Sequence, residues 1–321
     1  MANRITSGSQ SGGRPPAAVE IAPEGVLAAS LPGPGASPDY AFVSLPAGAL
    51  VPGIDGPNLR APDAVAAAIR SALSQVEPRS RAVTLVLPST LVRVFVLDFD
   101  SLPGKAAEAI PVLRFRLRKM VPFDVEHAGI SYQMLSQDKT ECRVLTTVLP
   151  GPILAEYEAA VRAAGYEPGA VLPSSLAALE AIDSIEAVLA ANLSALALAT
   201  SITNGQDLLL YRILDLPEDP SQRASEIQRG IAVAAAYFED RLGARPRRLY
   251  YSGSYPASDF AAWLADPELE VAEMVPHSSD NVSSHRLGKH RSPGAGSDSE
   301  VAPALGTANL ASVAGALAGA R

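Results

Sequence analysis

The fold is decided by residues Ala82 to Leu135, which read AVTLVLPSTLVRVFVLDFDSLPGKAAEAIPVLRFRLRKMVPFDVEHAGISYQML. The stretch opens with an apolar run of strand length, Val83 to Leu87, which Pro88 ends. A second run rich in β-branched residues follows from Leu91 to Leu97, and then a helix that closes at Met120 to Phe123. The order predicts two strands followed by an amphipathic helix.

That helix combines an apolar face with an aromatic residue that points elsewhere. At about 100° per residue, the apolar side chains share one face, formed by Ala106, Ile110, Leu113, Leu117 and Val121. Phe115 lies roughly 140° from Ile110, so it cannot join this face, and Arg114 and Arg118 flank it. Pro111 is expected in the first turn, where a missing N–H costs little. Either another part of the chain covers Phe115, or a partner does.

Three segments of the stretch resemble the type IV pilus assembly protein PilM. Leu113 to Phe123, LRFRLRKMVPF, resembles that family's IRWEAEKYIPF segment; Val86 to Ser89 resembles its VSLP strand end, and Ile130 to Leu135 its DYQVL strand. The resemblance implies an actin/FtsA-like fold and a role in docking the cytoplasmic tail of a membrane protein, PilN. Arg116 and Arg118 stand where the family has glutamates, which reverses the local charge.

This resemblance implies a partner-binding face made of Arg114, Phe115 and Arg118, with Pro122 and Phe123 at its end. Phe115 would supply an aromatic anchor, and the two arginines would supply donors for carbonyl or carboxylate groups of a peptide. We therefore expect a PilN-like tail as the partner, together with other pilus assembly proteins, and leave open a homo-oligomer.

The amino-acid composition limits which other classes of function are compatible with the sequence. The 321 residues suffice for two lobes, each with its own core, and 48% of them are hydrophobic. The net charge of −8 argues against nucleic acid as a partner. Cys142 is the only cysteine, so no disulfide framework or cysteine-based metal site is expected, and the four histidines are not arranged to bind a metal.

The sequence also indicates where the protein works. The N-terminus has no apolar core of a signal peptide, and the longest apolar stretch, Ala187 to Ile202, is too short to span a bilayer. We therefore expect a soluble cytoplasmic protein that is peripheral to the inner membrane, which it reaches through a partner rather than by direct insertion.

A β-β-β-α-β order occurs twice, about 170 residues apart, and this repeat is typical of the actin-like superfamily. The predicted domains are a tail at 1–16, a first lobe at 17–182 with an inserted 1C-type α+β subdomain at about 91–168, and a second lobe at 183–276. A flexible loop is expected at 277–303 and a C-terminal helix, packing back on the lobes, at 304–321.

Asp63 is expected to cap the first lobe's helix, and Ser174 or Ser175 the helix that follows the insertion. The second lobe's long helix is expected at Ser225 to Leu242.

Actin-like ATPases hold Mg-ATP between the lobes with Asp-x-Gly hairpins and a glycine-rich adenosine loop. Here the first hairpin keeps Glu20 and Gly25, but Pro23 lacks an N–H and Glu24 adds negative charge. The second hairpin carries Asn192 and Ser194 in place of Asp and Gly, and the adenosine loop retains Gly253. We therefore expect a degenerate nucleotide site with no catalytic residues, no metal and no cofactor; weak binding of ATP and Mg²⁺ without hydrolysis is the alternative.

Three functions are compatible with these residues. The favoured one is a cytoplasmic scaffold of type IV pilus assembly, a pseudo-ATPase and not an enzyme. A working actin-like ATPase or sugar-kinase relative is the second, which an ATP titration would distinguish. The third is the cytoplasmic domain of a type II secretion protein of the GspL kind, which would continue into a transmembrane helix.

Overall fold

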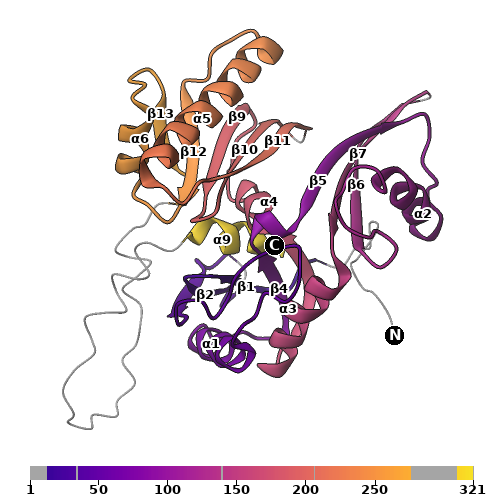
Figure 1. Ribbon diagram of the computed structural model, residues 1–321, viewed down its shortest axis with the longest axis vertical. Coiled ribbons are helices and arrows are strands. Elements are labelled where there is room, and N and C mark those ends of the chain that lie inside the picture. The colour runs from indigo at the N-terminus through magenta and orange to yellow at the C-terminus, as the bar shows by residue number, and fades with distance from the viewer. Residues whose placement is uncertain (1–12, 34, 139, 206, 276–308, 321) are drawn as a thin grey trace.

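The computed structural model describes residues 13–33, 35–138, 140–205, 207–275 and 309–320 (Figure 1). Three sheets organise them: two of five strands, one in each lobe, and one of three strands in a projecting subdomain. Residues 1–12 of the predicted tail and all of the predicted loop at 277–303 lie outside the described residues. In the part of the chain that is described, no helix is long and apolar enough to cross a membrane.

The first lobe is a mixed sheet in the order β3-β2-β1-β4-β8. Its strands are β1 (Ala17–Ala22), β2 (Gly25–Ser30), β3 (Asp39–Ser44), β4 (Ala82–Leu87) and β8 (Glu167–Pro173). The first three strands form an antiparallel meander, and β4 and β8 add parallel to β1. Helices α1 (Pro62–Gln75) and α3 (Gly151–Ala163) cover one face, and α4 (Ser174–Leu179) and α9 (Leu310–Ala318) the other.

The second lobe repeats this topology. Its sheet has the order β11-β10-β9-β12-β13, built from β9 (Ala187–Leu193), β10 (Ala197–Asn204), β11 (Asp207–Asp215), β12 (Arg248–Gly253) and β13 (Glu270–Glu273). Helices α5 (Pro220–Leu242) and α6 (Ala257–Leu264) pack on one face. Since β11-β10-β9-β12 matches β3-β2-β1-β4 strand for strand, the predicted duplicated actin-like fold is confirmed.

The projecting subdomain lies in the chain between β4 and α3. A short 3-10 turn, η1 (Ser89–Leu91), leads into β5 (Arg93–Phe99), α2 (Ala106–Leu117), β6 (Gly129–Gln137) and β7 (Cys142–Leu149). The sheet order is β5-β7-β6, and α2 packs on one face through Ala109, Leu113 and Leu117. Figure 1 shows this unit standing beside the second lobe.

Helix α9 joins the two lobes. Its Leu310, Val313 and Leu317 are buried in the core beneath the first sheet, while Ala311 packs with Val188 and Ala190 of the second. A Cβ at Gly315 would lie 1.8 Å from the carbonyl oxygen of Ala177 in α4, so only glycine permits this approach. The backbones of α4 and α9 are therefore in close contact where the lobes meet.

Four local predictions about where helices begin were wrong. Helix α1 begins with Pro62 after Ala61, whose side chain forms no cap, so Asp63 lies inside the first turn. Ser174 and Ser175 do not cap α4, since Pro173 holds the N-cap position. Helix α5 begins at Pro220, five residues before the predicted start, because the side chain of Asp219 caps it. Pro111 is exposed and lies inside α2 rather than in its first turn.

Candidate functional site

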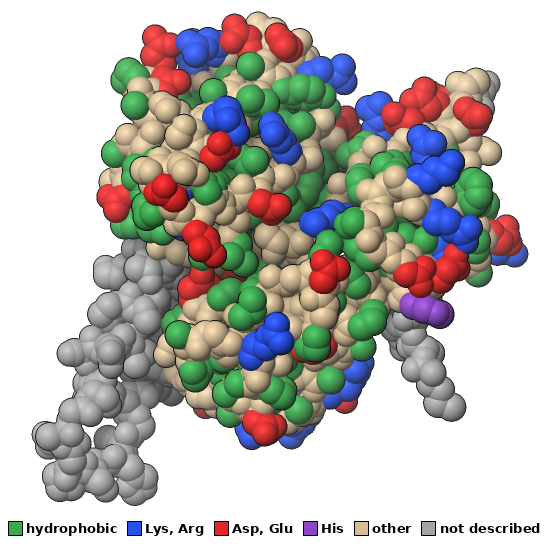
Figure 2. Space-filling view, in the orientation of Figure 1, with side chains coloured by type: hydrophobic (Ala, Val, Ile, Leu, Met, Phe, Trp, Pro, Cys, Tyr) green, Lys and Arg blue, Asp and Glu red, His purple; other side chains and the backbone are tan. Residues whose placement is uncertain are grey.

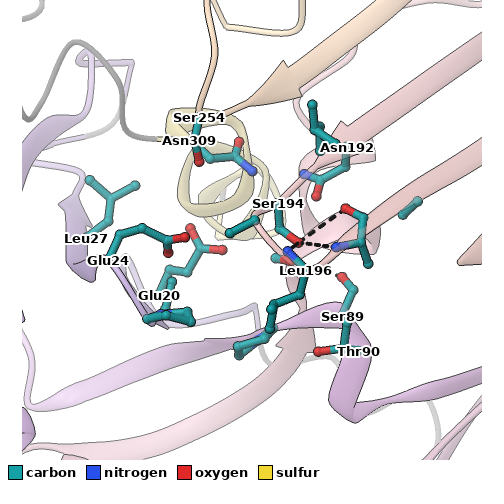
Figure 3. Close-up of a pocket in the computed structure, with 18 of the residues that line it drawn as sticks. Glu20, Glu24, Leu27, Ser89, Thr90, Asn192, Ser194, Leu196, Ser254 and Asn309 are labelled. Atoms are coloured by element: carbon teal, nitrogen blue, oxygen red, sulfur yellow. Dashed lines mark hydrogen bonds between the residues drawn. The ribbon is translucent and has the colours of Figure 1, made fainter. Parts of the chain in front are cut away.

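A cavity of about 120 Å³ lies between the two lobes (Figure 3). The β1–β2 hairpin forms one wall, the β9–β10 hairpin the opposite wall, and η1 with the start of α4 the floor. Polar side chains that line it are Glu20, Glu24, Ser89, Thr90, Ser174, Asn192, Ser194, Ser254 and Asn309. Equivalent hairpins of the two repeats therefore meet at a single site.

Glu20 is the principal charged group inside the cavity. Glu20 is only 8% exposed. Side chains alternate along β1, so Glu20 points toward α9 while Val19 and Ile21 point into the core on the other face of the sheet. Ser312 Oγ of α9 donates a hydrogen bond of 2.6 Å to Glu20 Oε2. Burial raises the pKa of Glu20 to about 7; the Ser312 bond opposes this shift and the charge of Glu24 adds to it. Glu20 thus titrates close to neutral pH.

The opposite wall is neutral and polar. Asn192 is 5% exposed, and its Nδ2 donates to Ser252 Oγ at 2.9 Å. Ser194 Oγ accepts from the N–H of Ala197 at 3.1 Å, which closes the β9–β10 turn. Figure 3 shows both side chains across the cavity from Glu20 and Glu24.

The two glycines predicted for this site are required by packing. A Cβ at Gly25 would lie 2.5 Å from the carbonyl oxygen of Val43, and one at Gly253 would lie 2.7 Å from that of Leu193. Gly25 lines the cavity, but Gly253 does not: it lines a neighbouring hollow, and Ser254 takes its place. The structure therefore brings Glu20, Gly25, Asn192 and Ser194 together and leaves Gly253 aside.

The lining residues do not suit Mg-ATP. A triphosphate requires N–H donors and cations, but Pro23 has no N–H and Glu24 is an anion. Among the described residues that line the cavity there is no Lys, Arg or His. The volume of about 120 Å³ is also below the range of about 300–1,000 Å³ of ordinary ligand pockets.

A cluster of hydroxyl groups beneath the cavity links three parts of the fold. Ser89 Oγ of η1 lies 2.9 Å from Ser174 Oγ and 2.7 Å from Ser175 Oγ of α4. Ser175 Oγ lies 2.6 Å from Tyr211 Oη of β11 in the second lobe. Because η1 leads directly into β5, this cluster connects the root of the projecting subdomain to both lobes.

Of the five predicted partner-binding residues, two are uncovered and three contact other parts of the subdomain. Phe115 is 75% exposed and Pro122 is exposed, so neither is covered by the described chain. Phe123 instead packs, half-buried, against the subdomain core. Arg114 donates to the carbonyl oxygen of Glu126 at 2.8 Å, and Arg118 forms an ion pair with the Glu126 carboxylate.

The outer face of α2 is basic and apolar. Val112, one turn before Phe115, is 37% exposed, and Met120, after the end of α2, is 39% exposed. Arg116 and Lys119 are exposed on the same side, and within the described residues neither has an ion pair. Figure 2 shows Lys and Arg side chains gathered on the projecting subdomain. Phe115 lies off the packed face, as the helical periodicity predicted, and no described segment covers it. Arg116, Arg118 and Lys119 are all exposed on this helix and the turn after it.

Two lobes of one repeated topology, with a subdomain inserted in the first and a cavity between them, define an actin-like protein. Among solved structures, the chain is similar to the PilM-PilN type IV pilus biogenesis complex. The TM-score is 0.70 at 18% identity, and the match covers 95% of this chain and 98% of that chain. This similarity shows that the chain has the PilM fold.

Two other solved structures match less closely. The cytoplasmic domain of EpsL, an inner-membrane component of the type II secretion system of Vibrio cholerae, has a TM-score of 0.47 and 15% identity, with 80% of this chain and 84% of that chain covered. EutJ from Carboxydothermus hydrogenoformans has a TM-score of 0.45 and 10% identity, with 96% and 92% covered. No protein-family model matches the sequence, and no curated protein does.

Several residues of the site could not be found from the sequence. Thr90 and Asn309 line the cavity, and Ser312 holds Glu20, yet none belongs to a recognisable motif. Tyr211 looked like an ordinary strand residue. Its partner Ser175 was expected to cap a helix. For Ser89 and Ser174, the only local signal in the sequence was the proline that precedes each of them.

Proposed function

We propose that this protein is a cytoplasmic scaffold of a type IV pilus assembly complex. It docks the cytoplasmic tail of a PilN-like inner-membrane protein and thereby lies at the membrane without inserting into it. The fold similarity to PilM in a PilM-PilN complex supports this role. The similarity alone does not identify the docking surface, which we infer from the side chains of α2.

The observation that carries the docking surface is the exposed aromatic ring of Phe115. A Phe that is 75% exposed on a helix, with the exposed Val112 one turn away, offers an aromatic anchor of the kind that dominates peptide interfaces. Leu113 and Leu117 fix the opposite side of α2 in the subdomain core, so Phe115 is held in place before binding.

Arg114 and Arg118 take a supporting part in this proposal. Both hold Glu126, which fixes the segment after α2 against the helix. Arg116 and Lys119 then provide the donors for carbonyl or carboxylate groups of the tail. Pro122 borders the face, and Phe123 anchors its end in the core.

The scaffold works without ATP hydrolysis. Glu20, Pro23 and Glu24 occupy the positions where an actin-like ATPase needs an Asp and phosphate-binding N–H groups, and no cation lines the described cavity. We expect ATP turnover at background and, by calorimetry with Mg-ATP, no micromolar affinity. Turnover that rises with protein concentration and is abolished by substituting a lining residue would contradict this.

A Phe115→Ala variant tests the docking surface. Tail affinity should fall by about 1–3 kcal/mol, or about 5–150-fold, because an aromatic anchor is lost. The melting temperature should barely change, because the ring contributes little to the core. A core position such as Leu113, replaced by Ala, should instead cost about 2–5 kcal/mol of stability.

Val233→Ala is the matched control. Val233 is 47% exposed on α5 of the second lobe, far from α2 in the sequence and on another domain. Its replacement should alter neither tail affinity nor stability. Unchanged affinity in Phe115→Ala, with a stable fold, would exclude the α2 face as the docking surface.

A further inference from the structure

The charged groups that line the interlobe cavity are carboxylates, and the other polar side chains of the lining are neutral hydroxyls and amides. Glu20 lies within it, and Glu24, which is exposed, stands at its edge on the same hairpin (Figure 3). The lining, in so far as the chain is described, contains neither lysine, arginine nor histidine. Such a wall repels anions and favours a ligand that carries N–H donors.

The carboxylate of Glu20 is incompletely compensated. It is 8% exposed, and the described residues give it one hydrogen bond, from Ser312 Oγ to Oε2. A buried carboxylate normally has several donors or a cationic partner. The second oxygen therefore offers an acceptor to whatever enters the cavity.

We propose that the cavity binds a small organic cation, an alkyl ammonium or diammonium of about six non-hydrogen atoms. One ammonium group donates to the free oxygen of Glu20, and a second ammonium reaches Glu24 at the edge. The volume of about 120 Å³ matches this size, since an engineered cavity of about 150 Å³ holds benzene. Phe42 and Leu27 line the cavity and suit the alkyl chain.

Binding should depend on pH through Glu20. Its pKa of about 7 means that a cation, which requires the ionised carboxylate, binds about tenfold more tightly at pH 8 than at pH 6. The groups around Glu20 do not obscure this effect. Strands β2 and β4 and the described part of α9 carry no titratable side chain, so Glu24 is the acid that faces it. On the other face of the sheet, α1 carries Asp63 and Arg70, and Arg70 donates to the carbonyls of Ala163 and Ala164.

The test is calorimetric titration of the full chain with 1,4-diaminobutane at pH 6, 7 and 8, in two buffers of different ionisation enthalpy. The proposal expects saturable binding that strengthens with pH and releases a proton at pH 7. The matched probes are 1,4-butanediol, which is neutral, and succinate, which is anionic; neither should bind. Undetectable binding of the diamine at 10 mM, equal binding of the diol, or heat from Mg²⁺ alone would overturn the proposal.

Three variants locate the site. Glu20→Gln should abolish the pH dependence and weaken binding at least tenfold, and Glu24→Gln, at an exposed position, should weaken it several-fold without affecting the fold. Glu268→Gln, on an exposed turn of the second lobe, should leave binding unchanged. Diamine binding that persists in both Glu20→Gln and Glu24→Gln would contradict the assignment. These results are independent of the proposed scaffold role, because none of them involves α2.

Discussion

The burial of Glu20 makes the stability of this protein depend on pH in a defined direction. The pKa of Glu20 rises from 4.5 to about 7 in the folded state, chiefly through burial. Below pH 4.5 the carboxyl group is protonated in both the folded and unfolded chain. Between pH 4.5 and pH 7 the unfolded chain loses this proton while the folded protein retains it, so the free energy of unfolding falls as pH rises.

The magnitude follows from the shift. A difference of about 2.5 in pKa corresponds to about 3 kcal/mol at 1.36 kcal/mol per unit. Glu20→Gln has nearly the same shape and no proton to lose, and its amide can still accept the bond from Ser312. Relative to Glu20→Gln, the wild-type protein should therefore lose about 3 kcal/mol of stability between pH 4.5 and pH 8.

Urea denaturation of both proteins at pH 4.5, 5.5, 6.5 and 8 measures this difference. Other titrating groups contribute equally to the two proteins, so the difference in unfolding free energy isolates Glu20. Glu24→Gln, at an exposed position, serves as the control and should show a much smaller pH-dependent difference. Parallel stability curves for wild type and Glu20→Gln would refute the argument that Glu20 is buried and poorly compensated.

Two further predictions concern the contacts between the lobes. Tyr211→Phe removes the 2.6 Å bond to Ser175 and should lower the free energy of unfolding by about 1 kcal/mol, as measured in urea; an unchanged value would show that water replaces the hydroxyl. Gly315→Ala places a methyl group 1.8 Å from the Ala177 carbonyl oxygen, so α9 must move from α4 at a cost of about 1–3 kcal/mol. Ala316→Gly, one residue along the helix, is its comparison, and a Gly315→Ala protein that melts at the wild-type temperature would contradict the close packing.

Local patterns predicted the fold because the same pattern occurs twice. The apolar runs of β1 to β4 and β9 to β12 are short strands between turns, which sequence periodicity detects directly. The position of Phe115 off the packed face followed from the same reasoning, since it depends only on which face of α2 holds Leu113 and Leu117. The strand pattern and the position of Phe115 on its helix both depend on residues that are close together in the chain.

The partners of individual side chains could not be predicted in this way. Ser312 and Glu20 are 292 residues apart, and only the return of α9 to the first lobe brings them together. Ser175 looked like a helix cap because a hydroxyl at that place usually bonds to the backbone, whereas here its hydroxyl contacts those of Ser89 and Tyr211. Arg114 and Arg118 were assigned to a partner, and the sequence did not show that Glu126, on the following segment, contacts both of them.

The measurement that tests the scaffold role most directly is site-specific photocrosslinking from position 115 in cells that assemble the pilus. A photoreactive phenylalanine analogue replaces Phe115, and the same analogue at Val233 serves as the reference. The account predicts a crosslinked product between position 115 and the cytoplasmic tail of the PilN-like protein, and none from position 233. A crosslink from position 115 only to another segment of the same chain, or a tail crosslink from position 233 alone, would contradict it.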